Sequence, residues 1–423
     1  MARLGSCLFF CESQPILCIV FDDMKKFQAI FFLNMMVPLS MALAQTVNLV
    51  PLTVRVNIQD ELAPNEAVVD GQWVAVGTNK PHALQYDYSR HWQGKPSFRF
   101  NLKEDDNTLE GYSEGETKGR AELSYCYATA DDVSKLTKEE LDLAVVSKMV
   151  YHYGKGACKQ GSTKYYRFSV FIPDSLSSDV STILAQWHGM PDRTLVTTPE
   201  GITKKISRQE FAKLCETMLF KKDKGHEKVL VTDGKGNPKK DKNGNVMYKA
   251  GQPNGWLVEQ GGYPPLAFGF SDGYFYIKAN SDRKWMSDKT DRCNINAAKA
   301  VVMKPQTSTY KSSTIAAKMP FAEFPKNQWV TFTIMVEWSA YGVEKETVEK
   351  DGRLDVKMDY SKDGKAFCNH LVNNQSVLIG RNDDDGYYFK FGIYRVGNSS
   401  VPVCYNLAGY SEGDSISDLK PIN

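Results

Sequence analysis

An eight-residue segment near the C-terminus constrains the fold of this 423-residue chain more than any other feature. Residues 388–395 read Y-F-K-F-G-I-Y-R, and with a period of two they divide into two unlike sets. The apolar set is Phe389, Phe391 and Ile393, and the polar set is Tyr388, Lys390 and Tyr394. Because successive side chains of a strand point to opposite faces, the apolar set predicts a strand packed on a core. Two phenols and an ammonium on the other face mark that face as a candidate functional surface.

Two other short segments have the same character. Arg120 and Glu122 alternate with apolar residues in R-A-E-L, and Gln186 and His188 alternate in Q-W-H. We interpret Glu122 as the ion-pair partner of Arg120 rather than as a catalytic group. Side chains of Arg, Gln, His, Tyr and Lys held by a rigid sheet are suited to removing a proton next to a carboxylate.

Period-two patterns recur along most of the chain. Apolar residues alternate with polar ones over 98–102, 166–172, 330–338 and 354–360, and segments rich in Gly, Pro, Asn and Asp separate such runs. Many half-buried strands joined by turns predict an all-β sandwich. With 42% hydrophobic residues the chain can form a large core, and its formal charge of +2 gives no overall preference for a polyanion.

The first 44 residues are interpreted as a leader. Met24-Lys25-Lys26 begins a basic segment, residues 27–43 are mostly apolar, and Ala42-Leu43-Ala44 forms a small-residue cleavage site before Gln45. This is the pattern of a secretory signal over about 24–44. Residues 1–23 are interpreted as lying upstream of the true start. A membrane anchor is the alternative, but the apolar segment is short and interrupted.

Residues 199–250 interrupt the strand pattern and are predicted to form an inserted subdomain, here called the thumb. Ser207 and Glu210 have capping-box spacing and predict a helix from there to about Leu219. Residues 203–249 carry 12 Lys and one Arg against six acidic residues, a net charge of +7, so the rest of the chain is −5. The thumb is either a solvated surface or a docking surface for a polyanion.

The motifs R-A-E-L, Q-W-H and Y-F-K-F-G-I-Y resemble the three strand motifs of the jelly-roll polysaccharide lyases, which include the alginate lyases. Longer segments such as G-E-T-K-G-R-A-E-L-S-Y and W-L-V-E-Q-G-G-Y-P-P-L-A-F-G-F, together and in order, resemble the heparin lyases across nearly the whole chain after the leader. The resemblance implies a β-jelly-roll sandwich with a concave substrate cleft. Its catalytic domain would comprise residues 45–198 and 251–423.

The resemblance also implies β-elimination on heparin at 2-sulfated iduronate. His188 would be the base, Tyr394 the acid for the O4 leaving group, and Gln186 and Arg120 would neutralise the uronate carboxylate. Further residues are expected to bind sulfate or carboxylate groups: Tyr388, Lys390, Arg193, and, in the thumb, Lys221, Lys222, Lys224 and Lys228. Two alternatives are a lyase for another uronate polymer, such as heparan sulfate or alginate, and a non-catalytic carbohydrate-binding jelly roll.

A loop with three consecutive carboxylates, Asp383 to Asp385, is either a surface turn or a site for a hard cation. Calcium prefers oxygen ligands of this kind. The resemblance implies a calcium-dependent enzyme whose ligands are Glu259, the Trp285 carbonyl, Asn382 and Asp383.

Six cysteines follow the predicted cleavage site, without a C-x-x-C motif, and we expect most to be free and buried. Cys158 lies between Lys155 and Lys159, which would lower its pKa. The expected partner is heparin or heparan sulfate, for a secreted, periplasmic monomer that binds neither nucleic acid nor, once the leader is removed, a membrane.

Overall fold

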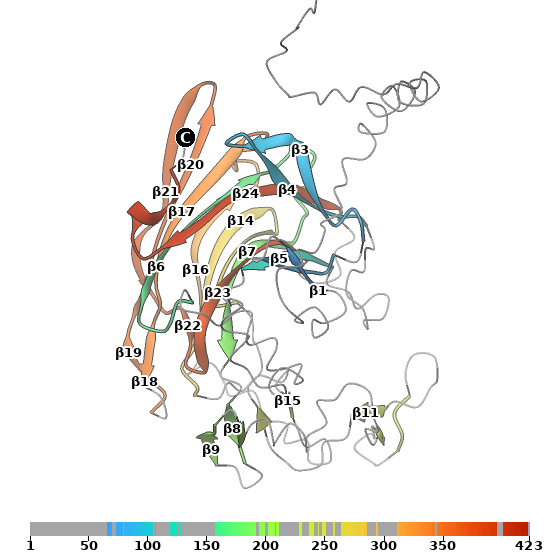
Figure 1. The fold of residues 1–423 in the computed structure, drawn as a ribbon, viewed down its shortest axis with the longest axis vertical. Helices are drawn as coiled ribbons and strands as arrows, with labels where there is room; N and C mark the ends of the chain where they lie inside the picture. Colours follow the sequence, from blue (N-terminus) through green and yellow to red (C-terminus); the bar gives the residue numbers. More distant parts are fainter. Residues whose placement is uncertain are drawn as a thin grey trace, which may run out of the picture. The chain divides into compact units, whose positions relative to one another are not determined.

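Two large antiparallel sheets face each other across one hydrophobic core (Figure 1). In this computed structural model the described residues lie between 66 and 421, and all of them belong to one compact unit, Thr46–Asn423. Not described within that span are 70–72, 79, 105, 107–118, 126, 128–156, 192–193, 199–201, 208, 211–227, 231–236, 241–243, 245–247, 251–256, 259–263, 286–292, 295–310, 343–344 and 396–400.

The first sheet contains nine strands, and it carries the candidate functional face. In spatial order they are β1 (Glu66–Val69), β2 (Trp73–Val76), β5 (Arg120–Tyr125), β23 (Asp384–Arg395), β7 (Thr182–Pro191), β13 (Leu266–Ser271), β14 (Tyr274–Asp282) and β16 (Lys311–Pro320), with β22 (Gly380–Arg381) pairing parallel to β14. The strands β5, β23 and β7 are adjacent although they are far apart in sequence, so the motifs of the three segments meet only through long-range pairing.

The second sheet contains seven strands. In order they are β21 (Lys365–Val377), β20 (Gly352–Lys362), β17 (Trp329–Glu337), β6 (Thr163–Phe171), β24 (Val403–Gly413), β4 (Lys95–Leu102) and β3 (Leu84–Trp92). The four segments whose alternation predicted strands correspond to β4, β6, β17 and β20, which confirms those predictions.

The core lies between the inner faces of the two sheets. Phe389, Phe391 and Ile393 are at most 1% exposed, so the apolar half of the opening segment is buried as predicted. Trp187 packs against Phe389 and Phe268, and Phe268 packs against Phe168 of the second sheet, with ring centroids 5.1 to 5.9 Å apart. Burial of this continuous aromatic core drives association of the two sheets.

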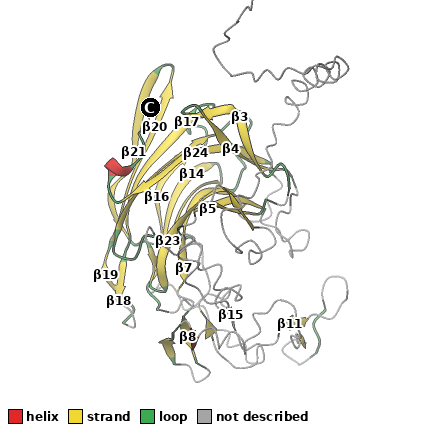
Figure 2. Cartoon of the chain, in the orientation of Figure 1, coloured by secondary structure: helices red, strands yellow, loops and turns green. Residues whose placement is uncertain are grey.

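Figure 2 shows that the described residues are almost entirely strands and loops, apart from the short 3₁₀ helix η3 (Ile416–Asp418). The predicted all-β jelly-roll sandwich is therefore confirmed. Among the described residues no helix is long and apolar enough to cross a membrane. The predicted leader lies outside the described residues.

Smaller sheets account for the remaining strands. One comprises β15 (Cys293–Asn294), β12 (Leu257–Val258), β8 (Leu195–Thr197) and β9 (Thr203–Lys205), and two pairs are β10 (Lys228–Leu230) with β11 (Tyr248–Ala250) and β18 (Ala340–Gly342) with β19 (Thr347–Lys350). The predicted capping box is formed: Ser207 N donates to Glu210 Oε2 at 2.8 Å and Glu210 N donates to Ser207 Oγ at 3.1 Å. The rest of that helix lies outside the described residues, and the thumb boundaries remain a prediction.

Candidate functional site

The polar faces of β5, β23 and β7 are brought into one surface by strand register. His188 is opposite Tyr388, and Gln186 is opposite Lys390. On the other side of β23, Tyr394 is opposite Arg120. Because directly opposed residues of an antiparallel pair share a face, the structure brings these predicted site residues onto one side of the sheet.

Glu122 is the centre of a buried charge cluster on this face. Its side chain is 2% exposed, and it accepts hydrogen bonds from Gln186 Nε2 and from Lys390 Nζ, the latter at 3.0 Å. Arg120 Nε lies 3.9 Å from the same carboxylate. The interpretation of Glu122 as an ion-pair residue is therefore confirmed, and Lys390 is included as a second cationic partner. Lys390 is 5% exposed, so Glu122 provides the counter-charge that a buried ammonium requires.

The ring of His188 is oriented by its own strand. Nδ1 lies 3.0 Å from the carbonyl oxygen of Gly189. A carbonyl only accepts, so Nδ1 carries the proton in the neutral ring and Nε2 keeps a lone pair. Burial, and next the positive charge of Lys390, lower the pKa of His188 well below its usual value. The half-buried imidazole is thus held neutral, in the tautomer that can accept a proton at Nε2.

Two phenols lie at opposite ends of the cluster. Tyr388 packs beside His188, with ring centroids 5.6 Å apart. Tyr394 lies beneath the guanidinium of Arg120, which is 4.2 Å from the ring centroid. The register partner of Tyr394 on β7 is Ile183, which is five residues from His188. The Cα atoms of Tyr394 and His188 are therefore separated by ~16 Å along the strand direction. Gln186, Lys390 and Glu122 occupy the space between these ends.

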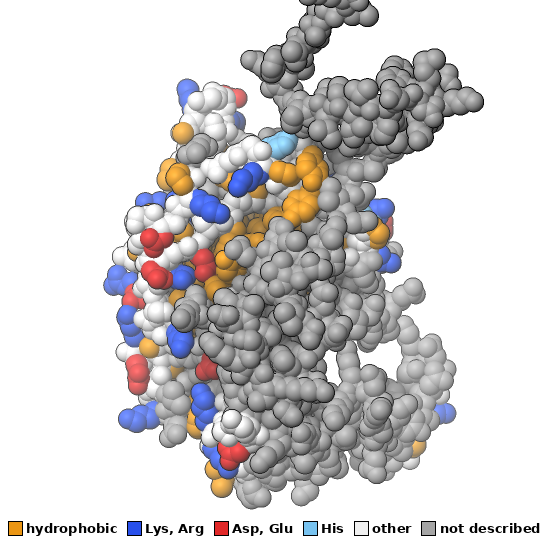
Figure 3. All heavy atoms as spheres, in the orientation of Figure 1, with side chains coloured by type: hydrophobic (Ala, Val, Ile, Leu, Met, Phe, Trp, Pro, Cys, Tyr) orange, Lys and Arg blue, Asp and Glu red, His pale blue; other side chains and the backbone are white. Residues whose placement is uncertain are grey.

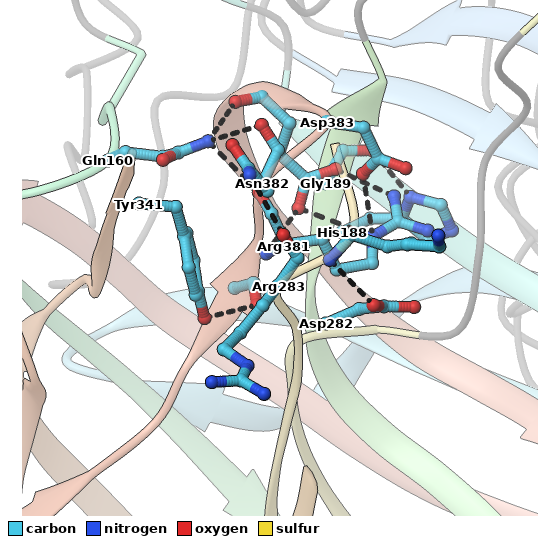
Figure 4. Close-up of polar contacts among 12 residues, drawn as sticks. Gln160, His188, Gly189, Asp282, Arg283, Tyr341, Arg381, Asn382 and Asp383 are labelled. Carbon is cyan, nitrogen blue, oxygen red and sulfur yellow. Dashed lines mark hydrogen bonds and ion pairs between the residues drawn. The ribbon is translucent and has the colours of Figure 1, made fainter. Parts of the chain in front are cut away.

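A second buried charge cluster supports the end of β7 that bears His188 (Figure 4). Arg381 is 2% exposed, and its Nη2 donates to Asp384 Oδ1 at 2.6 Å. Burial is the main reason that the pKa of Asp384 is raised to about 7. A Cβ on Gly189 would lie 2.1 Å from Asp384 Oδ1, so this position needs glycine for the loop to approach the strand. The carbonyl that holds His188 therefore belongs to a residue packed tightly against this loop.

The predicted calcium ligands that the structure describes lie around one cavity. Trp285, Asn382 and Asp383 all line a space of about 530 Å³. Asn382 Nδ2 donates to the Arg283 carbonyl at 2.8 Å, whereas its Oδ1 is buried without a hydrogen-bond partner among the described atoms. A buried oxygen left without a donor is costly in a protein and is a suitable ligand for a hard cation.

Basic side chains lie close to the carboxylates of this cavity. Lys205 Nζ is 3.8 Å from Asp385 Oδ1, and Arg381 Nε is 3.6 Å from Asp383 Oδ1. Among the described side chains no group of three or more His, Cys, Asp or Glu forms a metal cluster. A calcium site here would depend on carbonyl and amide oxygens together with Asp383. The predicted residues fit the ion, and its presence remains a prediction.

Several predicted site residues cannot be placed. Arg193, Glu259 and three thumb lysines, Lys221, Lys222 and Lys224, lie outside the described residues, and Lys228 begins β10 without a described side chain. On the face drawn in Figure 3, the described Lys and Arg side chains are interspersed with Asp and Glu. The basic docking surface therefore stays a prediction.

The prediction for Cys158 was wrong. Its thiol is 5% exposed and contacts Ser162 Oγ at 3.1 Å, and burial raises its pKa instead of lowering it. The hydrogen bond from Ser162 and the positive charge of Lys164 lower the pKa by less than burial raises it. Cys158, Cys368 and Cys404 are free as expected, but of these three only Cys158 is buried, since Cys368 is exposed and Cys404 is half-buried.

Sequence reasoning missed the Arg381–Asp384 pair as a support of His188. The three consecutive carboxylates predict a surface turn or a cation site and not this pair, because nothing in the local pattern shows that β23 begins with Asp384 buried against Gly189. It also missed Gln160, whose Nε2 donates to the carbonyls of Arg381, Asn382 and Asp384 at 3.0, 3.1 and 2.8 Å and thereby fixes the loop.

Comparison with known proteins identifies a family model and several similar proteins. Residues 69–406 match the family model described as polysaccharide lyase. Heparin lyase I of Pedobacter heparinus is 59% identical over 358 residues, which are 85% of this chain and 91% of that protein. Two solved structures show weaker similarity. A family 7 alginate lyase A1-II' in complex with substrate (GGMG) has a TM-score of 0.32 at 12% identity, covering 80% of this chain and 83% of its own. Alginate lyase vAL-1 from Chlorella virus has a TM-score of 0.30 at 8% identity, covering 78% and 92%.

The family match covers most of the chain and includes all three strand motifs. The resemblance of these motifs to those of polysaccharide lyases is thereby confirmed, and the chain belongs to the polysaccharide lyase family.

Proposed function

We propose that this lyase cleaves heparin by β-elimination, with His188 as the base. The observation that carries the proposal is the hydrogen bond between His188 Nδ1 and the Gly189 carbonyl, 3.0 Å long, which leaves Nε2 to take the C5 proton of a uronate. The lowered pKa keeps the imidazole neutral near neutral pH, as a base requires. Heparin as substrate is supported by the 59% identity to heparin lyase I.

The cluster between the two phenols would stabilise the charge that develops on the uronate carboxylate. Gln186 Nε2 uses one N–H on Glu122, and its second N–H is available to a substrate carboxylate. Arg120, whose side chain is 32% exposed, supplies a guanidinium at the rim. Glu122 fixes both donors before substrate arrives, and donors fixed in advance are the most effective way to stabilise a developing charge.

Tyr394 is assigned as the acid that protonates the O4 leaving group. In iduronate the C5 proton and O4 lie on opposite faces of the ring, so base and acid must approach from opposite sides. Tyr388 packs against His188 and would approach from the same side as the base. Tyr394 lies beyond the cluster, beside Arg120, with room for a sugar ring between it and His188.

Calcium, when bound by Asn382, Asp383 and the Trp285 carbonyl, would supply positive charge to the acidic loop. The loop packs against Gly189, so the ion would stabilise the segment that holds His188. We further propose export through the predicted signal at 24–44 and action as a periplasmic monomer.

The test is to follow the ultraviolet absorbance of the new C4–C5 double bond during incubation with heparin. His188→Ala should lose at least ~10²-fold in kcat while it still binds heparin, because removal of a general base costs that much. Tyr394→Phe should lose a similar factor, and Tyr388→Phe serves as the matched control on the same strand. New reducing ends without the absorbance would indicate hydrolysis and refute the proposal, as would near-normal turnover of His188→Ala.

A further inference from the structure

The polar face of the nine-stranded sheet continues past the catalytic strands. On β13, Ala267 is opposite Gln186, and on β14, Lys278 is opposite Ala267. With Lys390 opposite Gln186, this register forms one row across four strands. On β14, Phe275, Ile277 and Ala279 are fully buried in the core. The intervening Lys278 therefore lies on the same face as Gln186 and Lys390.

Lys278 differs from the other lysine of this row. Lys390 Nζ is bonded to Glu122 at 3.0 Å. Lys278 is only partly exposed, yet its ammonium makes no ion pair or hydrogen bond to any described residue. Its opposed neighbours, Ala267 and Ile315, are apolar, so neither adjacent strand supplies a counter-charge.

The neighbours of Lys278 along its own strand are also uncharged. Tyr276 and Asn280 share its face. Both ends of the Asn280 amide already form hydrogen bonds: Nδ2 donates to the Pro264 carbonyl at 2.8 Å, and Oδ1 accepts from Ser313 Oγ at 2.9 Å. An anionic ligand that reaches this face would therefore meet a cation that no described carboxylate already neutralises.

The strand between Lys278 and the catalytic cluster carries small side chains. On this face β13 presents Ala267 and Gly269, and a Cβ on Gly269 would lie 2.8 Å from Tyr276 Oη. Gln186 and Lys278 are two strand spacings apart, or ~10 Å between Cα atoms. Only the small residues Ala267 and Gly269 of β13 therefore lie between the Gln186 amide and the Lys278 ammonium on this face.

We propose that Lys278 binds an anionic group, a sulfate or a carboxylate, on a sugar unit next to the one at which elimination occurs. This inference rests on the proposed function, and it gives the substrate chain a direction across the strands, from β23 over β7 and β13 to β14.

The experiment compares Lys278→Gln, Lys278→Arg and a matched control, Lys357→Gln, which removes the same charge from an exposed position on β20 of the other sheet. Initial rates of unsaturated-product formation are measured with heparin at several salt concentrations. KM should rise about tenfold in Lys278→Gln, as expected for loss of a hydrogen bond between charged groups. The value of kcat should stay within about twofold, since the contact is made equally in ground and transition states.

The Arg variant should keep KM close to that of the wild type, and the Lys357 control should not change it. The Gln variant should also show a flatter dependence of kcat/KM on salt, because one fewer cation displaces counterions. Its melting temperature should not fall, because the ammonium has no partner among the described residues. Selectively desulfated heparins identify the ligand: the KM difference disappears when the sulfate it contacts is removed, and it persists on all of them if the ligand is the carboxylate.

Wild-type turnover of heparin tests the proposed function independently of Lys278. An active wild type with an unchanged KM in Lys278→Gln would overturn this inference alone. A fall in kcat at constant KM would also overturn it, because that result would place Lys278 in the chemical step.

Discussion

Glu122→Gln tests whether one buried carboxylate organises the candidate functional face. Glu122 is 2% exposed and Lys390 5% exposed, with Nζ and Oε2 3.0 Å apart. Neutralising Glu122 leaves Lys390 as a buried cation without a counter-charge, and breaking a buried pair from one side costs about 3–5 kcal/mol. Arg120 adds little to this cost because its side chain is 32% exposed and solvent can compensate.

The loss can be measured as a shift in melting temperature. The folded unit has about 380 residues, so an unfolding entropy of roughly 2 cal/mol/K per residue converts that cost into a decrease of about 4–6 °C. Activity should fall as well, because the new amide presents an N–H to Gln186 Nε2 and turns the Gln186 amide away from its present orientation.

Two controls separate charge from packing. Glu323→Gln removes an exposed carboxylate and should leave the melting temperature unchanged. Glu122→Gln combined with Lys390→Met removes both buried charges and should recover more than half of the lost stability, since an apolar residue of similar volume needs no counter-ion. A Glu122→Gln melting temperature within about 1 °C of wild type would refute the reasoning, because 3 kcal/mol would be visible.

Three further predictions concern pH, calcium and the thumb. Because the pKa of His188 is lowered well below its usual value, kcat/KM should stay constant through neutral pH and decline only on the acid side. Stability should also fall as pH drops below about 6.5, since the unfolded state then binds a proton that folded His188 resists; thermal melts of wild type and His188→Gln across pH 5–8 measure this difference, and identical profiles would contradict it. Chelation of calcium should lower both activity and melting temperature. Asn382→Leu should have the same effect and abolish the response to added calcium. An unchanged melting temperature after chelation would refute a stabilising calcium site. A further variant neutralises four thumb lysines, Lys221, Lys222, Lys224 and Lys228. Its KM should rise and depend less on salt, with kcat nearly unchanged, whereas parallel salt curves for wild type and variant would show that these lysines are only solvated.

Local pattern was sufficient for the strands and for their two faces. The alternation in residues 388–395 predicts which side chains enter the core, because a strand has a fixed period of two and cannot place Phe389 and Lys390 on one side. The capping box at Ser207 is equally local, and both of its hydrogen bonds form. Such features depend on neighbours within a few residues.

Pairing between distant strands was not predictable from any local pattern. The sequence indicates that Gln186, Lys390 and Glu122 are polar residues on strands, but only the register of β5, β23 and β7 makes Glu122 their common partner. The same register separates Tyr394 from His188 and places Tyr388 beside His188. A shift by one residue would have reversed every face.

The sequence by itself determined the chemistry available on the sheet, because residue types and their period of two are local properties. The tertiary structure decided which of those charges are neutralised. Lys390 is paired with Glu122, whereas Lys278, on the same face, has no counter-charge among the residues that the structure describes. Burial also reversed the expected pKa of Cys158, since desolvation depends on atoms brought in from distant strands and not on the lysines beside it in the chain.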